Sequence, residues 1–452
     1  MVSVKKPLTF VRYMTIVGTV EDTQLIGFLS SYKVKPLLLY MKRDVYLMQK
    51  LSSSTRIIFL IACCGALAIF SSTISKSLLS LFSEGLGATS AQIGLIASAS
   101  TVPGILISYI AGDLADRYGY KKILIGSLLI FATAPFLYFI VQQPLQLGMV
   151  RFYHGFATAA FGPVAMATVA AFSGKNTGQN LSLYSSATMV GRALAPIVAG
   201  GASDIGEYYK ISWHIPVYLF AAVAGVSALL IVLFFLRIHK EEEDQEAAKL
   251  NTGTEEKIPF FTKLAGLFRY RPLLYVGIFH AFVYFAHGAF EMVFPLHAVE
   301  LGMSKAQIGT VMSVQMVGII FLKPLFGKAS DKLGRLPMIV IGLGLSAAVF
   351  YLMMFTKSVA LIAALIVIYG LGFAIITASM SALAADVAQQ GQLGASLGVL
   401  STLMDVGQTF GPPIVGVIIG MYSNALGIGF LGVLLSAAIV FCLFAFRENA
   451  KA

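Results

Sequence analysis

The sequence has little charge, few cysteines and a single tryptophan. Charged residues make up 12% of its 452 residues, about half of the ~25% that is usual in a soluble domain, so a soluble globular fold is excluded. The three cysteines, Cys63, Cys64 and Cys442, lie inside apolar runs. Their positions give neither a disulfide framework nor a metal-ligand spacing, and we expect them to be small packing residues.

Motifs of enzymes and ATP-driven pumps are also missing from the sequence. It has no GxxxxGKS/T loop to cradle phosphates, no HExxH zinc motif and no GxSxG nucleophile elbow. No nucleophile stands beside a base at a spacing that would support catalysis. The sequence therefore predicts a protein that is not an enzyme, needs no cofactor or metal ion and is not driven by ATP.

Long apolar runs fill the chain instead, with 58% hydrophobic residues and a mean hydropathy of +0.83. From Ile57 onward these runs divide into twelve segments of about 20 residues, the length that crosses a bilayer as a helix. The sequence therefore predicts an all-α membrane protein with twelve transmembrane helices. The segments centre on Ala68, Ser98, Leu129, Thr158, Val190, Ala224, Phe285, Val314, Ser346, Gly372, Val406 and Leu434.

The longest internal polar stretch, residues 237–271, divides the twelve segments into two sets of six. We interpret its acidic run as a solvated connector between two six-helix bundles. The predicted parts are a basic N-terminal tail at 1–55, a first bundle at 56–237, a linker at 238–271, a second bundle at 272–446 and a C-terminal tail at 447–452.

The N-terminal tail has two interpretations. Its best apolar stretch is interrupted by Lys33, Lys35 and Pro36, so it should not span a bilayer. It is either a basic cytoplasmic segment that rests on anionic headgroups, or translation begins later, at Met41 or Met48. We favour the later start.

The net charge of +11 lies mostly in the loops between the apolar spans. Loops rich in Lys and Arg face the cytoplasm, and with both termini there only Lys210, Lys305 and Lys357 fall in loops on the other side. We therefore predict an integral protein of the cell membrane with both termini in the cytoplasm. Because the cations flank membrane spans, the charge does not indicate nucleic-acid binding.

One short polar turn occurs twice, as GDLADRYGYKK at Gly112–Lys122 and as GKASDKLGRLP at Gly327–Pro337. Each copy lies between two apolar spans and brings together Asp, Gly and cations, so one module is used twice. An Asp-Arg-x-Gly-basic turn in this position resembles the signature of the major facilitator superfamily, in the loops after its second and eighth helices. The resemblance covers Ile57–Phe446 and implies two pseudo-symmetric bundles that work by alternating access.

The resemblance also implies that the two turns form a cytoplasmic gate. In the first half the connection at 172–179 offers no acid to the turn, whereas Asp386 is available to Lys332 or Arg335 in the second half. We therefore predict an asymmetric gate, in which only the second copy is ion-paired. The gate residues are Gly112, Asp116, Arg117, Gly119, Lys121, Gly327, Asp331, Lys332, Gly334, Arg335 and Asp386.

Two further motifs resemble the drug/proton antiporter branch of that family. The fifth span contains GRALAPIVAGG at Gly191–Gly201, although Ala195 stands where the branch has a glycine. The fourth contains RFYHG at Arg151–Gly155, with His154 in place of a glutamine. The alternative for the first motif is ordinary packing of small residues.

Ionisable residues inside the spans are few, and such residues are functional candidates by default. A buried carboxylate can bind and release a proton, so we predict proton coupling at Asp405 and Glu291. Alternatively, Asp405 is the structural partner of a buried Arg. The alternative for Glu291 is a residue of the outer vestibule. The predicted substrate-cavity residues are Arg151, His154, Arg192, His287 and Gln315.

The alternatives for these cavity residues are structural. Arg151 could extend to the outer surface, Arg192 could bond the carbonyls freed around Pro196, and each histidine could be a hydrogen-bonded core residue. Lys76, near the outer end of the first span, is expected at the membrane interface.

The favoured function is proton-coupled export of small amphiphilic compounds by a monomeric carrier, with protons as the coupling ion and the lipid bilayer as its surroundings. A second hypothesis is uptake of a metabolite by a symporter or uniporter. A third, of another class, is a membrane sensor that transports nothing. A large appended domain would favour the sensor, and the sequence shows none.

Overall fold

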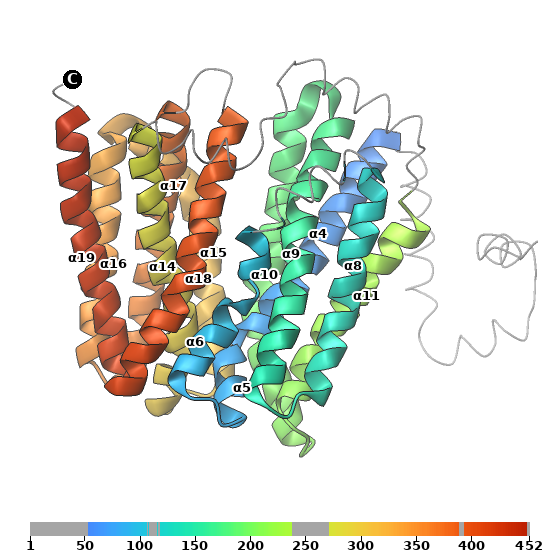
Figure 1. Cartoon of the computed structure of the whole chain (residues 1–452), viewed down its shortest axis with the longest axis horizontal. Coiled ribbons are helices and arrows are strands. Elements are labelled where there is room, and N and C mark those ends of the chain that lie inside the picture. The colour runs from blue at the N-terminus through green and yellow to red at the C-terminus, as the bar shows by residue number, and fades with distance from the viewer. Residues whose placement is uncertain are drawn as a thin grey trace, which may run out of the picture. The chain divides into compact units, whose positions relative to one another are not determined.

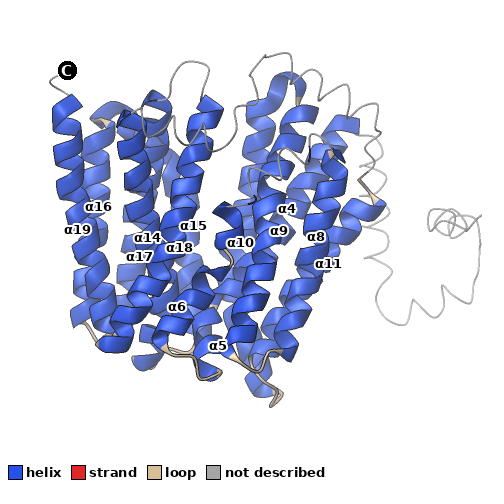
Figure 2. Ribbon diagram, in the orientation of Figure 1, coloured by secondary structure: helices blue, strands red, loops and turns tan. Residues whose placement is uncertain are grey.

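The computed structural model describes residues 53–105, 107, 115, 118–236, 271–387 and 393–449, and every regular element within these ranges is helical (Figures 1 and 2). The predicted N-terminal tail and linker fall almost wholly outside them, whereas α19 continues to Asn449, inside the predicted C-terminal tail at 447–452. The described elements are α4 (Ser53–Ser77), α5 (Leu79–Gly85), α6 (Ser90–Ala99), α8 (Tyr120–Leu137), η1 (Tyr138–Ile140), α9 (Pro144–Phe172), η2 (Gly174–Asn176), α10 (Thr177–Tyr208), α11 (His214–Phe234), α14 (Arg271–Glu300), α15 (Lys305–Leu333), α16 (Arg335–Phe355), α17 (Val359–Val387), α18 (Leu393–Met421) and α19 (Asn424–Asn449).

Ten of the described helices are long and apolar enough to cross a membrane. They are α4, α8, α9, α11 and α14 to α19. Of the twelve predicted spans, the two without such a helix centre on Ser98 and Val190. The first falls on α6, which ends at Ala99 close to residues outside the description. The second falls on α10, which has 32 residues but carries Arg192, Asp204 and Glu207, so its length is sufficient and its composition is more polar.

The helix starts show a second internal repeat, which the sequence analysis missed. Gly85–Gly94 reads GLGATSAQIG and Glu300–Gly309 reads ELGMSKAQIG. In each copy a capping box closes the helix start, between Thr89 and Gln92 for α6 and between Ser304 and Gln307 for α15, which satisfies backbone N–H groups that have no partner within the helix.

The repeated polar turns also share their backbone geometry. Gly119 precedes α8 with φ of 94°, and Gly334 precedes α16 with φ of 93°. Residues with a side chain rarely adopt this left-handed backbone conformation, whereas glycine does so freely. The turn glycine of each copy is therefore required by the sharp reversal between two helices.

Helices from the two halves of the sequence pack together at two seams. We call α4–α11 the N-half and α14–α19 the C-half. α6 lies against α18, and α10 lies against α15. Glycines allow close backbone approach there, because a side chain at Gly94 would overlap the Pro412 backbone and one at Gly309 would overlap the Pro196 carbonyl.

The largest buried core spans both halves and is rich in aromatic rings in the C-half. Phe290 of α14 lies 4.7 Å from Tyr369 of α17 and 5.5 Å from Phe350 of α16, measured between ring centroids. These contacts fix α14 against its neighbours and so position the polar side chains of that helix.

Candidate functional site

The second polar turn contains the ion pair that the sequence predicted. Nε of Arg335 donates to Oδ2 of Asp386 at 2.9 Å, and the same guanidinium contacts Asp331 and donates to Ser330 at 3.1 Å. Lys332 and Gly327 lie near the end of α15, and Lys332 makes no ion pair with the residues described. The pair joins α16 to α17, and its role in gating stays a prediction.

The first polar turn is described only at its end. Gly119 forms the reversal before α8, and Lys121 lies in the first turn of that helix. Gly112, Asp116 and Arg117 lie outside the described residues. The predicted asymmetry of the gate therefore stays a prediction.

Glu291 of α14 is paired across the two halves. Nζ of Lys76, near the end of α4, donates to Oε2 of Glu291 at 2.6 Å. The side chains are 28% and 15% exposed, so the pair is largely withdrawn from solvent. The interfacial position expected for Lys76 stays a prediction, and the structure adds that its ammonium is held by a carboxylate of the C-half.

His287 lies one turn before Glu291 and contacts it. Its Nε2 is 3.7 Å from Oε1 of Glu291, and its Nδ1 is 3.2 Å from the Tyr369 hydroxyl. The imidazole stacks on Phe373 with 4.2 Å between ring centroids. The candidate His287 is therefore a buried link between α14 and α17. His280, two turns earlier on the same face, stacks on Tyr284 at 6.1 Å.

Arg192 is an exposed residue of α10 that faces the C-half. Its positive charge acts on Tyr284, His287 and Glu291 of α14 and on Lys323 of α15. Within the described part of the chain, Arg192 shows no hydrogen bond to the carbonyls around Pro196. Near Pro196, the N–H of Ile197 donates to the Ser313 hydroxyl of α15 at 2.8 Å. Arg192 thus places a cation between the halves.

Asp405 of α18 lies at the other seam. A methyl group at Gly104 would stand 3.2 Å from its Oδ2, and one turn further along, Thr409 shares a 2.7 Å hydrogen bond with Thr101. Asp405 makes no ion pair with any residue in the described ranges. The suggestion that Asp405 is the structural partner of a buried Arg therefore finds no support among them.

Arg151 and His154 of α9 are buried, with 2% and 1% exposure. Arg151 donates to Ser100 at 2.6 Å, and His154 lies 3.4 Å from the Tyr138 hydroxyl. Because Arg151 is buried, it does not extend to the membrane surface. Contact with substrate stays a prediction for both side chains.

The Ser100 contact predicts a measurable loss of stability. A hydrogen bond to a charged group contributes about 1.5–3 kcal/mol, and Ser100→Ala removes the hydroxyl that Arg151 uses. We expect the variant to melt several degrees below the wild type in detergent. The control is Ser98→Ala, in α6 just before Ser100, because among the described residues the Ser98 hydroxyl bonds only its own helix, at Leu95. Equal melting temperatures for the two variants would contradict a supporting role for this contact.

Gln315 of α15 is the remaining candidate. Its side chain is 2% exposed, and Nε2 has no hydrogen-bond partner within the described part of the chain. A methyl group at Gly370 would lie 2.8 Å from its Cγ, so the side chain packs on α17. A buried amide without a hydrogen-bond partner costs free energy. A bound ligand that accepted a hydrogen bond from Nε2 would remove that cost.

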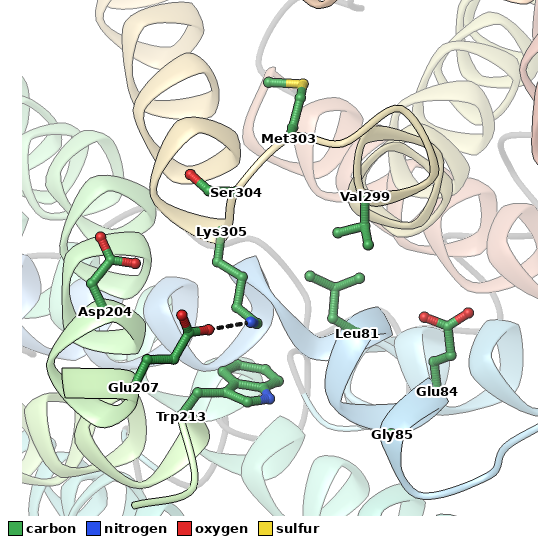
Figure 3. A pocket seen from close by; sticks show the side chains of 10 residues that line it. All are labelled: Leu81, Glu84, Gly85, Asp204, Glu207, Trp213, Val299, Met303, Ser304 and Lys305. Atoms are coloured by element: carbon green, nitrogen blue, oxygen red, sulfur yellow. Dashed lines mark hydrogen bonds and ion pairs between the residues drawn. The ribbon is translucent and has the colours of Figure 1, made fainter. Parts of the chain in front are cut away.

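A pocket of about 370 Å³, which the sequence did not predict, lies between the halves at the end where α5 lies, opposite the C-terminus (Figures 1 and 3). We call this end the α5 end. Lys305 enters the pocket, pairs with Glu207 at 2.7 Å and lies 5.3 Å from the Trp213 ring centre (Figure 3). Its lining residues are Leu81, Glu84, Gly85, Asp204, Glu207, Trp213, Val299, Met303, Ser304 and Lys305. No cluster suited to a metal ion occurs among the described residues.

Comparison with known proteins supplies the family. The model of the Major Facilitator Superfamily matches residues 61–304 and 276–452. The chain belongs to the major facilitator superfamily. The predicted family is thereby confirmed, and with it the prediction of an integral membrane transporter rather than an enzyme.

Individual relatives are distant. An uncharacterized MFS-type transporter of Methanocaldococcus jannaschii is 24% identical over 78% of this chain and 87% of its own length. Multidrug resistance protein 1 of Bacillus subtilis is 23% identical over 74% and 82%. The inward-facing, unoccupied structure of a bacterial homologue of the lysosomal transporter Spinster aligns with a TM-score of 0.75, at 16% identity, over 88% of this chain and 98% of that one. This last likeness concerns the fold alone.

Proposed function

We propose that this transporter exports small amphiphilic compounds in exchange for protons. The observation that carries the proposal is Asp405, a carboxylate without an ion pair in the described ranges, at the seam where α18 of the C-half meets the N-half at Gly104. A carboxylate at a moving interface can accept a proton in one conformation and release it in another, because its surroundings change as the halves separate.

The proposed coupling uses the cost of burying charge. When α6 and α18 close on Asp405, the ionised carboxylate loses water and gains no described counter-ion. Protonation removes that cost, so a proton favours closure of this seam. A coupling of about 1–3 kcal/mol is sufficient for allosteric control. Glu291 is the second proposed carboxylate, and its surroundings differ because Lys76 pairs with it.

We further propose the complete architecture that this mechanism needs. α6 with its continuation and α10 would complete twelve spans in two six-helix bundles. Both termini and both polar turns would face the cytoplasm, so that the α5 end faces outward at the cell membrane. The seams formed by α6 with α18 and by α10 with α15 would open and close as the halves move.

Support for export comes from a relative named as a multidrug resistance protein, at 23% identity. The proposed substrate contacts are Arg192, which lies exposed between the halves, and His287 with its aromatic neighbours on α14 and α17. Aromatic rings accept many flat apolar compounds, which suits a carrier of amphiphiles.

The test is transport in proteoliposomes with an imposed pH gradient, against a panel of amphiphilic compounds. We expect movement of compound against the direction of proton flow, and its loss when an ionophore dissipates the gradient. Movement with the protons would show symport, and transport indifferent to the gradient would show uniport. Either result would overturn the proposed exchange.

A further inference from the structure

The pocket at the α5 end carries more negative than positive charge in its lining. Three carboxylates line it, from Glu84 of α5 and from Asp204 and Glu207 of α10, against the single ammonium of Lys305. A recess that is lined by an excess of one charge attracts ions of the opposite sign. The pocket therefore favours cations.

Carboxylates alone do not make a binding site, and the structure adds an aromatic ring on which a cation already lies. The ammonium of Lys305 is 2.7 Å from Oε1 of Glu207 and 5.3 Å from the centre of the Trp213 ring (Figure 3). A cation within about 6 Å of an indole ring is attracted by the negative face of the ring. Glu207 and Trp213 thus form a cation site that a side chain of the same chain occupies in this conformation.

The Lys305 ammonium can leave this site at little cost. The Glu207 side chain is 60% exposed, and an ion pair that is open to water contributes little. A lysine ammonium also stands on a flexible stem, which can turn toward solvent. A free cation with an apolar body makes further contacts in the pocket and so can displace Lys305.

The remaining walls offer those contacts. Leu81 of α5, Val299 of α14 and Met303, just before α15, line the same pocket (Figure 3). Its volume of about 370 Å³ lies within the range of small-molecule sites, which are mostly apolar with a few polar groups. The combination of acids, an aromatic ring and apolar side chains fits an amphiphilic cation.

Trp213 is held in place by its own half of the protein. Its ring meets the Phe82 ring edge-on, with 6.2 Å between the ring centroids. A Cβ at Gly206 of α10 would lie 2.7 Å from Cα of Trp213, so this glycine lets the connection between α10 and α11 approach α10 closely. Because the ring is already positioned, little conformational freedom is lost when a ligand binds to it.

The seam of α6 with α18 shows that helix packing does not require this charge. Gly200 of α10 lies against the first two residues of α15, and Gly416 of α18 lies in the same way against the first two residues of α6. Seven residues beyond each glycine stand Glu207 in one seam and Ser423 in the other. One seam is therefore built without an acid at this place, and packing of the helices does not explain Glu207.

We propose that this pocket binds an organic ammonium ion with a short apolar body. The cationic group takes the place of the Lys305 ammonium beside Glu207 and the Trp213 ring, and the apolar body lies against Leu81 and Met303. Lys305 acts as a built-in competitor, which turns away when the ligand enters.

This site is separate from the proposed substrate contacts. Arg192 and Glu207 both belong to α10 and are fifteen residues apart, which is about 22 Å at the rise of 1.5 Å per residue of an α-helix. Binding in the pocket requires neither export of a compound nor exchange of protons, so it is measured without transport.

The experiment uses the fluorescence of Trp213, which is the only tryptophan in the chain. The purified protein in detergent micelles is titrated with hexyltrimethylammonium. Hexanol and hexanoate, which have a chain of the same length and no charge or a negative charge, are the control compounds. We expect a saturable change of the Trp213 emission with the cation alone. A change of equal size with hexanol would show insertion into the micelle instead and would overturn the proposal.

Two substitutions in the pocket should shift the Kd of hexyltrimethylammonium in opposite directions. Glu207→Gln removes a carboxylate that binds the cation and should raise the Kd about five-fold, whereas Lys305→Met removes the competing ammonium and should lower it about five-fold. Each change corresponds to about 1 kcal/mol. Lys357→Gln is the matched control, because Lys357 is an exposed cation of the α16–α17 connection that does not line the pocket. Its Kd should equal that of the wild type.

The outcomes decide the proposal independently of export. Equal effects of Lys305→Met and Lys357→Gln would show a response to overall charge, and an unchanged Kd in Glu207→Gln would show that the cation binds elsewhere; either result refutes the site. If size-exclusion chromatography shows that Glu207→Gln is unfolded, Glu84→Gln on α5 replaces it and must also raise the Kd. Binding as expected in a protein that exchanges no compound for protons would leave the site established and the proposed function refuted.

Discussion

Asp405→Asn is expected to abolish transport driven by a pH gradient while exchange without a gradient continues. Asparagine has nearly the shape of aspartate but cannot bind or release a proton, so the contact beside Gly104 is preserved and the coupling is lost. The measurement compares the initial rate with and without an imposed gradient. The stimulation by the gradient, present in the wild type, should disappear in the variant.

The matched control for Asp405→Asn is Asp204→Asn on α10. Asp204 is an acid that lines the pocket at the α5 end, away from the seam of α6 and α18. This control should keep the response to the gradient. If Asp405→Asn responds like the wild type, Asp405 is structural and the coupling proton must be sought at Glu291.

Gly309→Val is expected to reduce transport at least ten-fold by holding the α5 end apart. A Cβ at this position of α15 would overlap the carbonyl oxygen of Pro196 on α10. The positions of the Cβ atom and of the carbonyl oxygen are both fixed by the backbone. Rotation of a side chain therefore cannot relieve the clash, and the two helices must separate. Overpacking of this kind costs about 1–3 kcal/mol, and about 1.4 kcal/mol changes a population ratio ten-fold.

The control for this substitution lies on the same helix. A Cβ at Gly318 would meet nothing within 4 Å, so Gly318→Val should retain transport although the change in composition is identical. Distances between spin labels on cysteines introduced at Tyr208 and Lys357, both exposed, should lengthen in the Gly309 variant alone. Full activity of Gly309→Val would show that the tight contact of α10 with α15 is not needed for the transport cycle.

The fold was largely predictable because each helix forms from hydrogen bonds between residues that are close together in the sequence. A backbone in lipid must satisfy its own hydrogen bonds, so each apolar run of sufficient length becomes a helix. The repeated turn at Gly119 and Gly334 and its resemblance to a known signature then identified the family. The related helix starts at Gly85–Gly94 and Glu300–Gly309 are also local, since each capping box joins residues three positions apart.

The candidate site was predicted in its residue types and only partly in its contacts. The pair of Arg335 with Asp386 followed from two turns at the ends of neighbouring helices, where few partners are within reach. The hydrogen-bond partners of the buried charged residues were not predicted. Glu291 binds Lys76, and Arg151 binds Ser100.

The sequence by itself determined that the chain is a helical transporter of the major facilitator superfamily, since hydropathy and short turn motifs act over neighbouring residues. Only the tertiary structure decided that Lys76 meets Glu291 and that Asp405 lies against Gly104. Such contacts depend on how each helix is rotated and tilted against helices that are distant in the chain. Packing of side chains across the two seams sets those angles, and no local pattern in the sequence encodes them.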